Sequence, residues 1–204
     1  MLDSVQSQTV LFMGPQGSGK GTQVELLKSY IEKNDSRPVV FFEMGRSLRK
    51  LAEAETRAGS ITKEILDGGN LVPSAVSASL FTTYAMDNLK TGDEHLIIDG
   101  FPRTVSQIPM LDSALIDFYN RPSPVVLWIE VSQKESLKRL LLRGRHDDTE
   151  ENIKKRLEWS EAETRPALDW FKNNAVYRVF TINGEQSVED VFKDIRAALF
   201  NGNN

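Results

Sequence analysis

The strongest constraint on this chain is a short glycine-rich segment that follows an apolar run. Residues 10–13 are all apolar, and residues 14–20 then read Gly-Pro-Gln-Gly-Ser-Gly-Lys. Glycines let the backbone turn its N–H groups inward where a strand ends, and the N-terminus of the next helix attracts an anion. An amphipathic segment containing Leu27 and Ile31 supplies that helix. We predict a strand, a phosphate-binding loop and a helix, with Lys20 reaching the outer phosphates of a nucleotide; the alternative is a glycine-rich turn with a surface lysine.

Composition limits the kinds of site that the chain can build. It has 204 residues, no cysteine and a net charge of −4. We expect one domain over residues 1–204, without disulfides and without zinc held by cysteine. The two histidines, His95 and His146, are far apart in sequence and suggest no metal cluster.

The chain also shows no targeting or membrane segment. No early run resembles a signal peptide, and no apolar run approaches the ~18 residues that span a membrane. We therefore expect a cytoplasmic protein with no membrane partner. The acidic net charge argues against nucleic acid as a partner, and it makes local groups of arginines informative, because they indicate a small anion. No exposed apolar stripe is evident, so we expect a monomer.

Short apolar runs alternate with segments of helical periodicity. Runs of this kind are typical of strands covered on both faces, and the alternation predicts a parallel sheet in an α/β fold. The runs are residues 10–13, 39–43, 96–99, 125–131 and 176–182.

The stretch from residue 45 to residue 90 departs from this alternation. Its periodicity predicts three helices and no strand, over about 46–58, 61–67 and 74–90. One crossover between strands needs less helix than this. We therefore expect part of the stretch to project from the sheet as a helical insert beside the phosphate loop.

Several helix starts carry a capping-box pattern, in which Ser, Thr or Asp is followed three residues later by Glu or Gln. These patterns begin at Thr104, Ser132 and Asp148. A last helix is expected from Ser187 to Leu199.

A candidate metal ligand follows the third apolar run. Residues 96–99 read Leu-Ile-Ile-Asp, so a strand ends in the carboxylate of Asp99. In phosphate-loop proteins an acid at this place can hold the Mg²⁺ that bridges the phosphates, and one carboxylate suffices because Mg²⁺ keeps several waters. We predict that Asp99 holds Mg²⁺ through water; the alternative is a turn at the end of the strand.

Six arginines lie on segments that we expect to come close to the phosphate loop in the folded chain. Arg139 and Arg143 are four residues apart and share one helix face. Taken singly, each arginine could be an ordinary solvent-exposed side chain. Taken together with a phosphate loop, the six predict a site that binds a polyphosphate. Guanidinium groups align phosphates and neutralise their charge. The set is Arg49, Arg103, Arg139, Arg143, Arg145 and Arg156.

The residue after Lys20 limits which classes of phosphate-loop protein this chain can belong to. Gly21 stands where many phosphate-loop proteins have the Ser or Thr that binds Mg²⁺. This argues against the common GTPase and motor-ATPase layouts. No cysteine or histidine is suited to a covalent intermediate, so direct in-line transfer of a phosphoryl group is the simplest mechanism.

In order, these motifs resemble those of the nucleoside monophosphate kinases, most closely the short-lid adenylate kinases. The resemblance covers about residues 8–199 and is carried by Gly17-Ser-Gly-Lys-Gly-Thr-Gln23, Leu71-Val72-Pro73, Asp99-Gly-Phe-Pro-Arg-Thr104 with Gln107, and Asp147-Asp148 before residues 153–157. It implies a phosphate-loop kinase fold with a five-stranded parallel sheet flanked by helices. It also implies a monophosphate-binding insert over about 44–73 and a very short lid over about 144–148.

The resemblance further implies a donor site for ATP. Arg139 would lie against the adenine, Gln186 would border it, and Arg143 would grip the phosphates. The phosphates would be cradled by Gly17, Ser18, Gly19, Lys20, Gly21 and Thr22. The implied catalytic residues are Lys20, Arg103, Arg143, Arg145 and Arg156.

An acceptor site for AMP is implied in the same way. Arg49 and Arg103 would hold its phosphate, and Gln107 would read its base; the alternative for Gln107 is the capping box of Thr104. The full implied set is Met44, Arg49, Asn70, Leu71, Val72, Gly100, Phe101, Pro102, Arg103, Gln107, Arg145 and Arg156.

The implied activity is the reversible transfer of the terminal phosphate of Mg-ATP to AMP, which gives two ADP. Two residues depart from the pattern of the family, which has Ser-Thr-Gly-Asp where this chain has Glu43-Met44-Gly45-Arg46. Met44 and Arg46 therefore leave two alternatives open. One is a kinase for UMP, CMP or dAMP, and the other is a nucleotide-binding sensor with little turnover.

Overall fold

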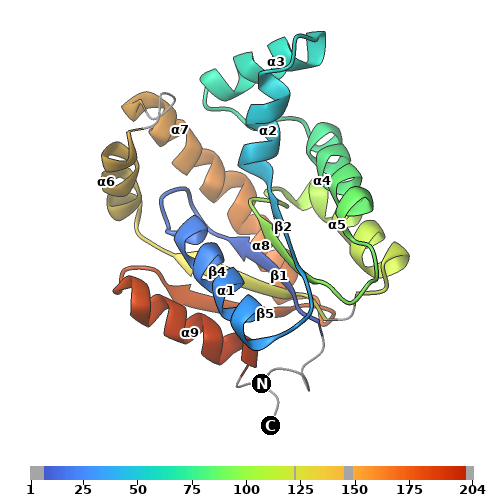
Figure 1. Ribbon diagram of the computed structural model, residues 1–204. Coiled ribbons are helices and arrows are strands. Elements are labelled where there is room, and N and C mark those ends of the chain that lie inside the picture. Colours follow the sequence, from blue (N-terminus) through green and yellow to red (C-terminus); the bar gives the residue numbers. More distant parts are fainter. Residues whose placement is uncertain (1–6, 122, 145–148, 201–204) are drawn as a thin grey trace.

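The structure is a computed structural model that describes residues 7–121, 123–144 and 149–200. At its centre is a sheet of five parallel strands in the order β2-β3-β1-β4-β5 (Figure 1). The strands are β1 (Thr9–Met13), β2 (Val39–Glu43), β3 (His95–Asp99), β4 (Val125–Glu130) and β5 (Arg178–Asn183). The predicted five-stranded parallel sheet is confirmed, and each strand begins and ends within two residues of its predicted run.

Helices cover both faces of the sheet. Because side chains alternate along a strand, Val10 and Phe12 of β1 face one layer, whereas Leu11 and Met13 face the other. The first layer is α1 (Lys20–Asn34) with α9 (Val188–Phe200). The second layer contains α4 (Ser74–Asn88), α5 (Ile108–Asp112) and α8 (Arg165–Lys172).

Two further pairs of helices stand above the carboxyl ends of the strands (Figure 1). One pair is α2 (Met44–Ala52) and α3 (Arg57–Asp67), and the other is α6 (Gln133–Arg143) and α7 (Glu150–Trp159). The strand order reverses beside β1, so its carboxyl end, where the phosphate loop begins, lies at the switch point of the sheet. This is where an open α/β sheet binds its ligands.

The projecting insert is present, but its helices differ from the predicted ones. A single helix over 46–58 is wrong, because α2 ends at Ala52 and α3 begins at Arg57. The hydroxyl of Thr56 accepts a hydrogen bond from the Gly59 N–H at 3.0 Å and caps α3. Continuous apolar spacing hid this break, since a capping threonine inside such a pattern resembles a helical residue.

The predicted capping patterns can be compared with the observed starts of three other helices. The Ser132 hydroxyl accepts from the Glu135 N–H at 3.3 Å, which confirms that cap. Asp148 is not the cap of α7, because Thr149 fills that place and accepts from the Asn152 N–H at 3.2 Å; Asp148 lies outside the described residues. The last helix begins at Val188, and the Ser187 hydroxyl accepts from the Asp190 N–H.

Three short helical segments complete the fold. A 3-10 turn, η1 (Val105–Gln107), precedes α5, and a π-helix, η2 (Ser113–Phe118), follows it. A second π-helix, η3 (Ser160–Thr164), joins α7 to α8, so that helical backbone runs from Glu150 to Lys172. None of the described helices is long and apolar enough to cross a membrane.

A buried polar network ties the amino ends of the strands together. The Nδ1 atom of His95 accepts a hydrogen bond from the Gln8 N–H at 3.0 Å, so its proton is on Nε2, which faces Asp35 at 3.1 Å. Arg37 pairs with Asp35 through side-chain hydrogen bonds that hold the pKa of that carboxyl well below its usual value. Burial lowers the pKa of His95, so the ring is neutral at pH 7.

Candidate active site

The phosphate loop connects β1 to α1, as the sequence predicts. Gly19 has φ +93° and is the N-cap of α1, which begins at Lys20. A Cβ atom at Gly17 would lie 2.8 Å from the Ser136 carbonyl oxygen, so only glycine allows α6 to approach the loop this closely. The chain thus presents a helix N-terminus and a tight backbone turn above the switch point, an arrangement suited to an anion.

The ammonium group of Lys20 lies over its own loop. Its Nζ donates to the carbonyl oxygens of Gly14 at 2.9 Å and Pro15 at 2.8 Å. Burial lowers the pKa of Lys20 to about 8, while Asp99 counteracts this shift and Arg103 and Arg143 add to it. Lys20 is therefore a buried cation without a carboxylate in direct hydrogen-bond contact among the described residues.

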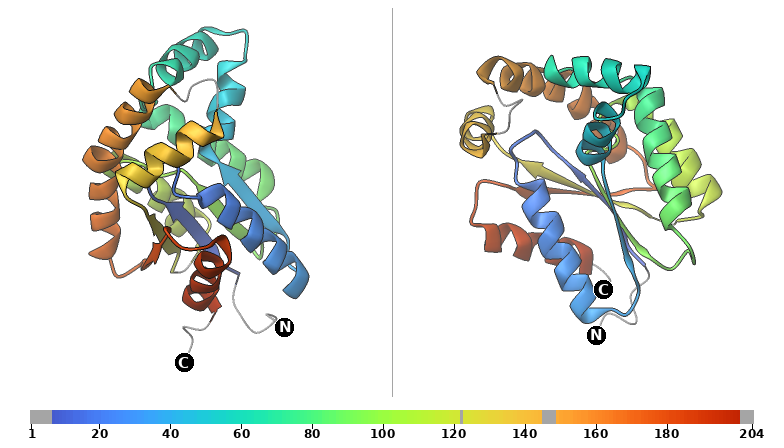
Figure 2. Two further views of the ribbon diagram at one scale, coloured as in Figure 1. Left: turned by 90° about the vertical axis from the view of Figure 1, so that its left-hand side faces the viewer. Right: turned by 45° about the horizontal axis from the view of Figure 1, so that its top comes forward.

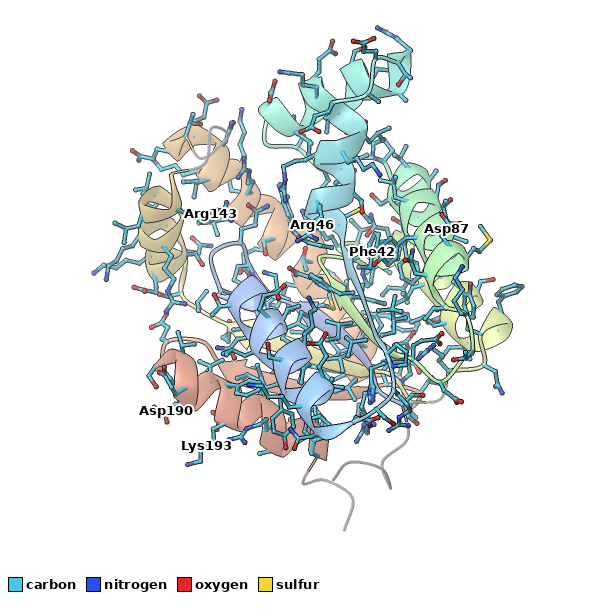
Figure 3. The ribbon with its side chains drawn as sticks, viewed as in Figure 1. Phe42, Arg46, Asp87, Arg143, Asp190 and Lys193 are labelled. Carbon is cyan, nitrogen blue, oxygen red and sulfur yellow. The ribbon has the colours of Figure 1, made fainter. Side chains whose placement is uncertain are left out.

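A cleft of about 550 Å³ opens above this loop. It brings together five of the six predicted arginines, from four separate segments of the chain. The residues from the predicted set that line it are Gly17, Gly19, Lys20, Gly21, Thr22, Arg49, Asn70, Asp99, Gly100, Arg103, Arg139, Arg143 and Arg156. Figure 3 labels Arg143 at the end of α6 and Arg46 on α2, two helices that stand apart above the sheet.

Arg103 is held by a backbone carbonyl and an aromatic ring. Its Nε donates to the Gly100 carbonyl oxygen at 2.9 Å, and its guanidinium lies over the Trp159 ring, 5.2 Å from the centroid. The backbone N–H of Arg103 donates to Gln107 Oε1 at 2.6 Å. Burial lowers the pKa of Arg103, while Asp99 opposes the shift. The two terminal nitrogens have no hydrogen-bond partner among the described residues and remain available to an anion.

The other arginines have contacts that place them around the cleft. Arg49 pairs with Glu43 at 3.1 Å, and Arg46 pairs with the second oxygen of the same carboxylate at 3.2 Å. Arg139 donates to Glu135 at 2.7 Å and to the Gly184 carbonyl oxygen at 3.0 Å. A cleft with this excess of cations attracts a polyanion.

Arg156 is buried and comes from α7. Its Nη1 donates to Gln16 Oε1 at 3.3 Å, so an arginine of α7 meets a side chain of the phosphate loop. The remaining predicted arginine, Arg145, lies outside the described residues, as does most of the predicted lid at 144–148.

Asp99 lies where a metal ligand would be needed. It ends β3 beside the carboxyl end of β1, and it lines the same cleft as Lys20. Among the described residues no group of three or more His, Cys, Asp or Glu could enclose a metal ion. A single carboxylate beside a phosphate site still fits Mg²⁺, which retains waters and takes further oxygens from phosphates.

The rest of the predicted set lies beside the cleft and does not line it. Ser18, Met44, Val72, Phe101 and Gln107 are all buried. Pro102 borders a small neighbouring cavity, and Leu71 is half-buried next to Asn70. The Gln186 side chain donates to the Asn183 carbonyl oxygen and to Asp194.

Gln107 does not form the capping box that was the alternative to base contact. Its Oε1 accepts from the Arg103 N–H, and the Thr104 hydroxyl lies against Ser106 at 2.9 Å. Its amide nitrogen has no partner among the described residues.

Ten of the described residues line the cleft without having been predicted as site residues. They are Gln16, Glu25, Phe41, Glu43, Gly45, Leu48, Leu66, Gly69, Leu140 and Trp159. Trp159 carried a usable signal, because it follows Arg156 by three residues and so shares its helix face. Gln16 carried none, since it contacts an arginine 140 residues away. Glu43 lies three and six residues before its partners Arg46 and Arg49, so its pairing was open to local sequence reasoning.

Comparison with known proteins agrees with this geometry. A model of a protein family described as adenylate kinase matches residues 12–176. An adenylate kinase of Prochlorococcus marinus (strain MIT 9515) is 34% identical over 190 residues, which cover 93% of this chain and 97% of that protein. One from Leptospira biflexa serovar Patoc (strain Patoc 1 / Ames) is 36% identical over 196 residues, covering 93% and 98%. Adenylate kinase 1 of Nostoc sp. (strain PCC 7120 / SAG 25.82 / UTEX 2576) is 32% identical over 192 residues, covering 93% and 97%. The chain belongs to the adenylate kinase family.

Proposed function

We propose that this protein transfers the terminal phosphate of Mg-ATP to AMP and forms two ADP reversibly. The observation that carries the proposal is the convergence of Lys20 and five arginines, from separate segments, on one cleft. A transfer between two phosphate chains needs both chains aligned and their charge neutralised, and little covalent chemistry from the protein. The similarity to adenylate kinases favours AMP over other acceptors.

On the donor side, the loop from Gly17 to Thr22 cradles the ATP phosphates with its backbone N–H groups. Lys20 leaves its two carbonyl partners and turns to the outer phosphates. Arg139 lies against the adenine, with Gln186 and Gly184 nearby, because the Arg139–Gly184 contact already holds that side chain beside the loop at 184–186.

On the acceptor side, the insert over residues 44–73 holds AMP. Arg49 and Arg103, which line the same cleft, bind its phosphate, and Gln107 presents its unpaired amide to the base. An amide can donate and accept at once along the edge of adenine. Asn70, Leu71 and Val72 contact the nucleoside through their backbone.

The reacting phosphates meet between Lys20, Arg143 and Arg156. These cations stabilise the negative charge that spreads over the transferred group. The AMP phosphate is already ionised at neutral pH, so the attack needs no general base. Asp99 would hold Mg²⁺, and the bound ion would neutralise charge on the donor phosphates. Arg145 would add a further phosphate contact.

The test is an acceptor panel. The protein is incubated with Mg-ATP and one monophosphate at a time (AMP, dAMP, UMP or CMP), and formation of the matching diphosphate is measured. ADP formation that depends on AMP and exceeds the other rates supports the proposal. Turnover with UMP or CMP alone would replace the acceptor, and binding without turnover would indicate a sensor.

Two lysine variants complete this test. Lys20→Met should abolish turnover. Lys193→Met, which changes an exposed lysine of α9 on the opposite side of the molecule from the insert, should leave turnover unchanged (Figure 3).

A further inference from the structure

Trp159 is a cleft residue that the roles above leave unused. It is the last residue of α7, where that helix passes into the π-helix η3. Its half-buried side chain lines the large cleft and also a small cavity of about 20 Å³ that borders Lys20, Arg103 and Thr164. The indole therefore lies at the wall between the phosphate loop and the acceptor arginine.

One face of the indole fixes Arg103. The guanidinium lies 5.2 Å from the ring centroid, and Gly100 holds its Nε at 2.9 Å from the other direction. A cation over an indole face is attracted by the ring electrons, and the ring also blocks other side-chain rotamers. With Nε and one face occupied, the guanidinium is held with its terminal nitrogens available to the cleft.

The indole N–H fixes the insert. Trp159 Nε1 donates to the Gly69 carbonyl oxygen at 3.1 Å, and Asn152 of α7 donates to the Asp67 carbonyl oxygen at 2.9 Å. Gly69 has φ +70°, and a Cβ atom there would lie 3.3 Å from Asn152, so the turn after α3 packs closely against α7. Figure 2 (right) shows the α3 segment beside α7. The next residue, Asn70, lines the cleft.

We propose that Trp159 is a positioning residue for the acceptor, which sets both the plane of Arg103 and the distance of the insert from α7. The inference rests on the proposed function, because it assigns the Arg103 side of the cleft to a nucleoside monophosphate. The two contacts belong to one side chain, so the indole links the orientation of Arg103 to the position of the insert.

Two substitutions separate the two contacts. Trp159→Phe keeps one aromatic ring on this side of Arg103 and removes the N–H together with the second ring of the indole, and it should raise the KM for AMP by about 5-fold. Trp159→Leu removes both contacts and should raise that KM by about 10-fold or more. In both variants the KM for ATP should stay within about twofold of the wild type, since the hydrogen bond and the cation contact of the indole go to Gly69 and Arg103, on the acceptor side. Trp170→Phe, in α8 and packed against Tyr177 away from the cleft, is the matched control.

A spectroscopic measurement tests the geometry without turnover. The Arg103 Nε–H is hydrogen-bonded, and its resonance is identified by its loss in Arg103→Lys. In the free protein the shielding of the indole should shift this resonance. Trp159→Leu should remove the shift, and Trp159→Phe should retain part of it.

The outcomes separate the inference from the proposed function. An unchanged Arg103 resonance in Trp159→Leu, or equal losses of ATP and AMP affinity, would overturn the positioning role even if AMP turnover is normal. Absence of AMP turnover in the wild type would overturn the proposed function, whatever the resonance does. If Trp159→Leu does not fold, an unchanged KM for AMP in Trp159→Phe would still overturn the inference.

Discussion

Raising the pH above about 8 is expected to weaken the capture of ATP, because Lys20 then loses the proton that its phosphate contact requires. Burial lowers the pKa of this lysine from 10.5 to about 8. At pH 7 about nine-tenths of the free enzyme has a charged Lys20, and at pH 9 about one-tenth. The kcat/KM for ATP should therefore fall about 5-fold between pH 8 and pH 9, and about tenfold per unit above that.

The two kinetic constants should titrate differently. The kcat/KM for ATP reports the free enzyme, in which Lys20 contacts only its own loop. The constant kcat reports the nucleotide complex, in which bound phosphates favour the charged lysine and raise its pKa again. We therefore expect kcat at saturating AMP to stay level beyond the pH at which kcat/KM has fallen. A kcat/KM for ATP that remains flat to pH 10, or a fall of both constants at the same pH, would refute the reasoning.

The same pKa shift has a consequence for stability. The folded pKa of Lys20 lies below the unfolded one, so the unfolded chain binds more protons between about pH 8 and pH 10.5, and the unfolding free energy rises across that window. Below it, the buried charge costs on the order of 3 kcal/mol. Lys20→Met should therefore raise the Tm of the free protein at pH 7 although it abolishes turnover. A lower Tm would show that the carbonyl contacts of the ammonium outweigh its burial.

Arg143→Ala should lower kcat by about 10³-fold or more, and a loss below about tenfold in a steady-state assay would remove Arg143 from the mechanism. Chelation of Mg²⁺ should abolish ADP formation, and Asp99→Asn should raise the Mg²⁺ concentration for half-maximal rate by about tenfold; an unchanged Mg²⁺ titration would exclude that carboxylate. The unfolding free energy in urea should fall as the pH drops below 6.5, because burial lowers the pKa of His95 and the unfolded chain then binds more protons. His95→Gln, which cannot titrate, should lose this part of the slope, and equal slopes in both proteins would contradict the assignment.

Most of the fold could be predicted from local sequence patterns. The strands are legible because both faces of the sheet are covered, so that each strand is an almost continuous apolar run. Errors occurred where a polar side chain decides a boundary. Thr56 caps a helix that the periodicity placed elsewhere, since one hydroxyl–backbone hydrogen bond leaves no trace in apolar spacing. Thr149 caps α7 in place of the neighbouring Asp148, which a capping-box pattern had indicated.

The candidate site divides in the same way. Arg49, Arg103 and Arg156 were found from motifs, because phosphate recognition demands guanidinium groups at fixed places in the chain. The contacts that orient them were not found. Gln16 meets Arg156, and Trp159 meets Arg103, across 140 and 56 residues of sequence respectively. Such pairs follow from how α7 packs over the phosphate loop, which single-sequence periodicity does not encode.

The donor and acceptor ends of the cleft differ in how much their cationic side chains must rearrange to bind a phosphate. Arg103 keeps its Gly100 and Trp159 contacts while its terminal nitrogens face the cleft, so binding an acceptor phosphate requires little rearrangement. Lys20 must first leave the carbonyl oxygens of Gly14 and Pro15. The donor phosphates therefore have to replace two existing hydrogen bonds of a buried cation, whereas the acceptor phosphate adds contacts to a guanidinium that is already oriented. Because rearrangement reduces the affinity gained from a contact, we expect pH to affect catalysis mainly through donor binding, and side-chain packing to affect it mainly through acceptor binding.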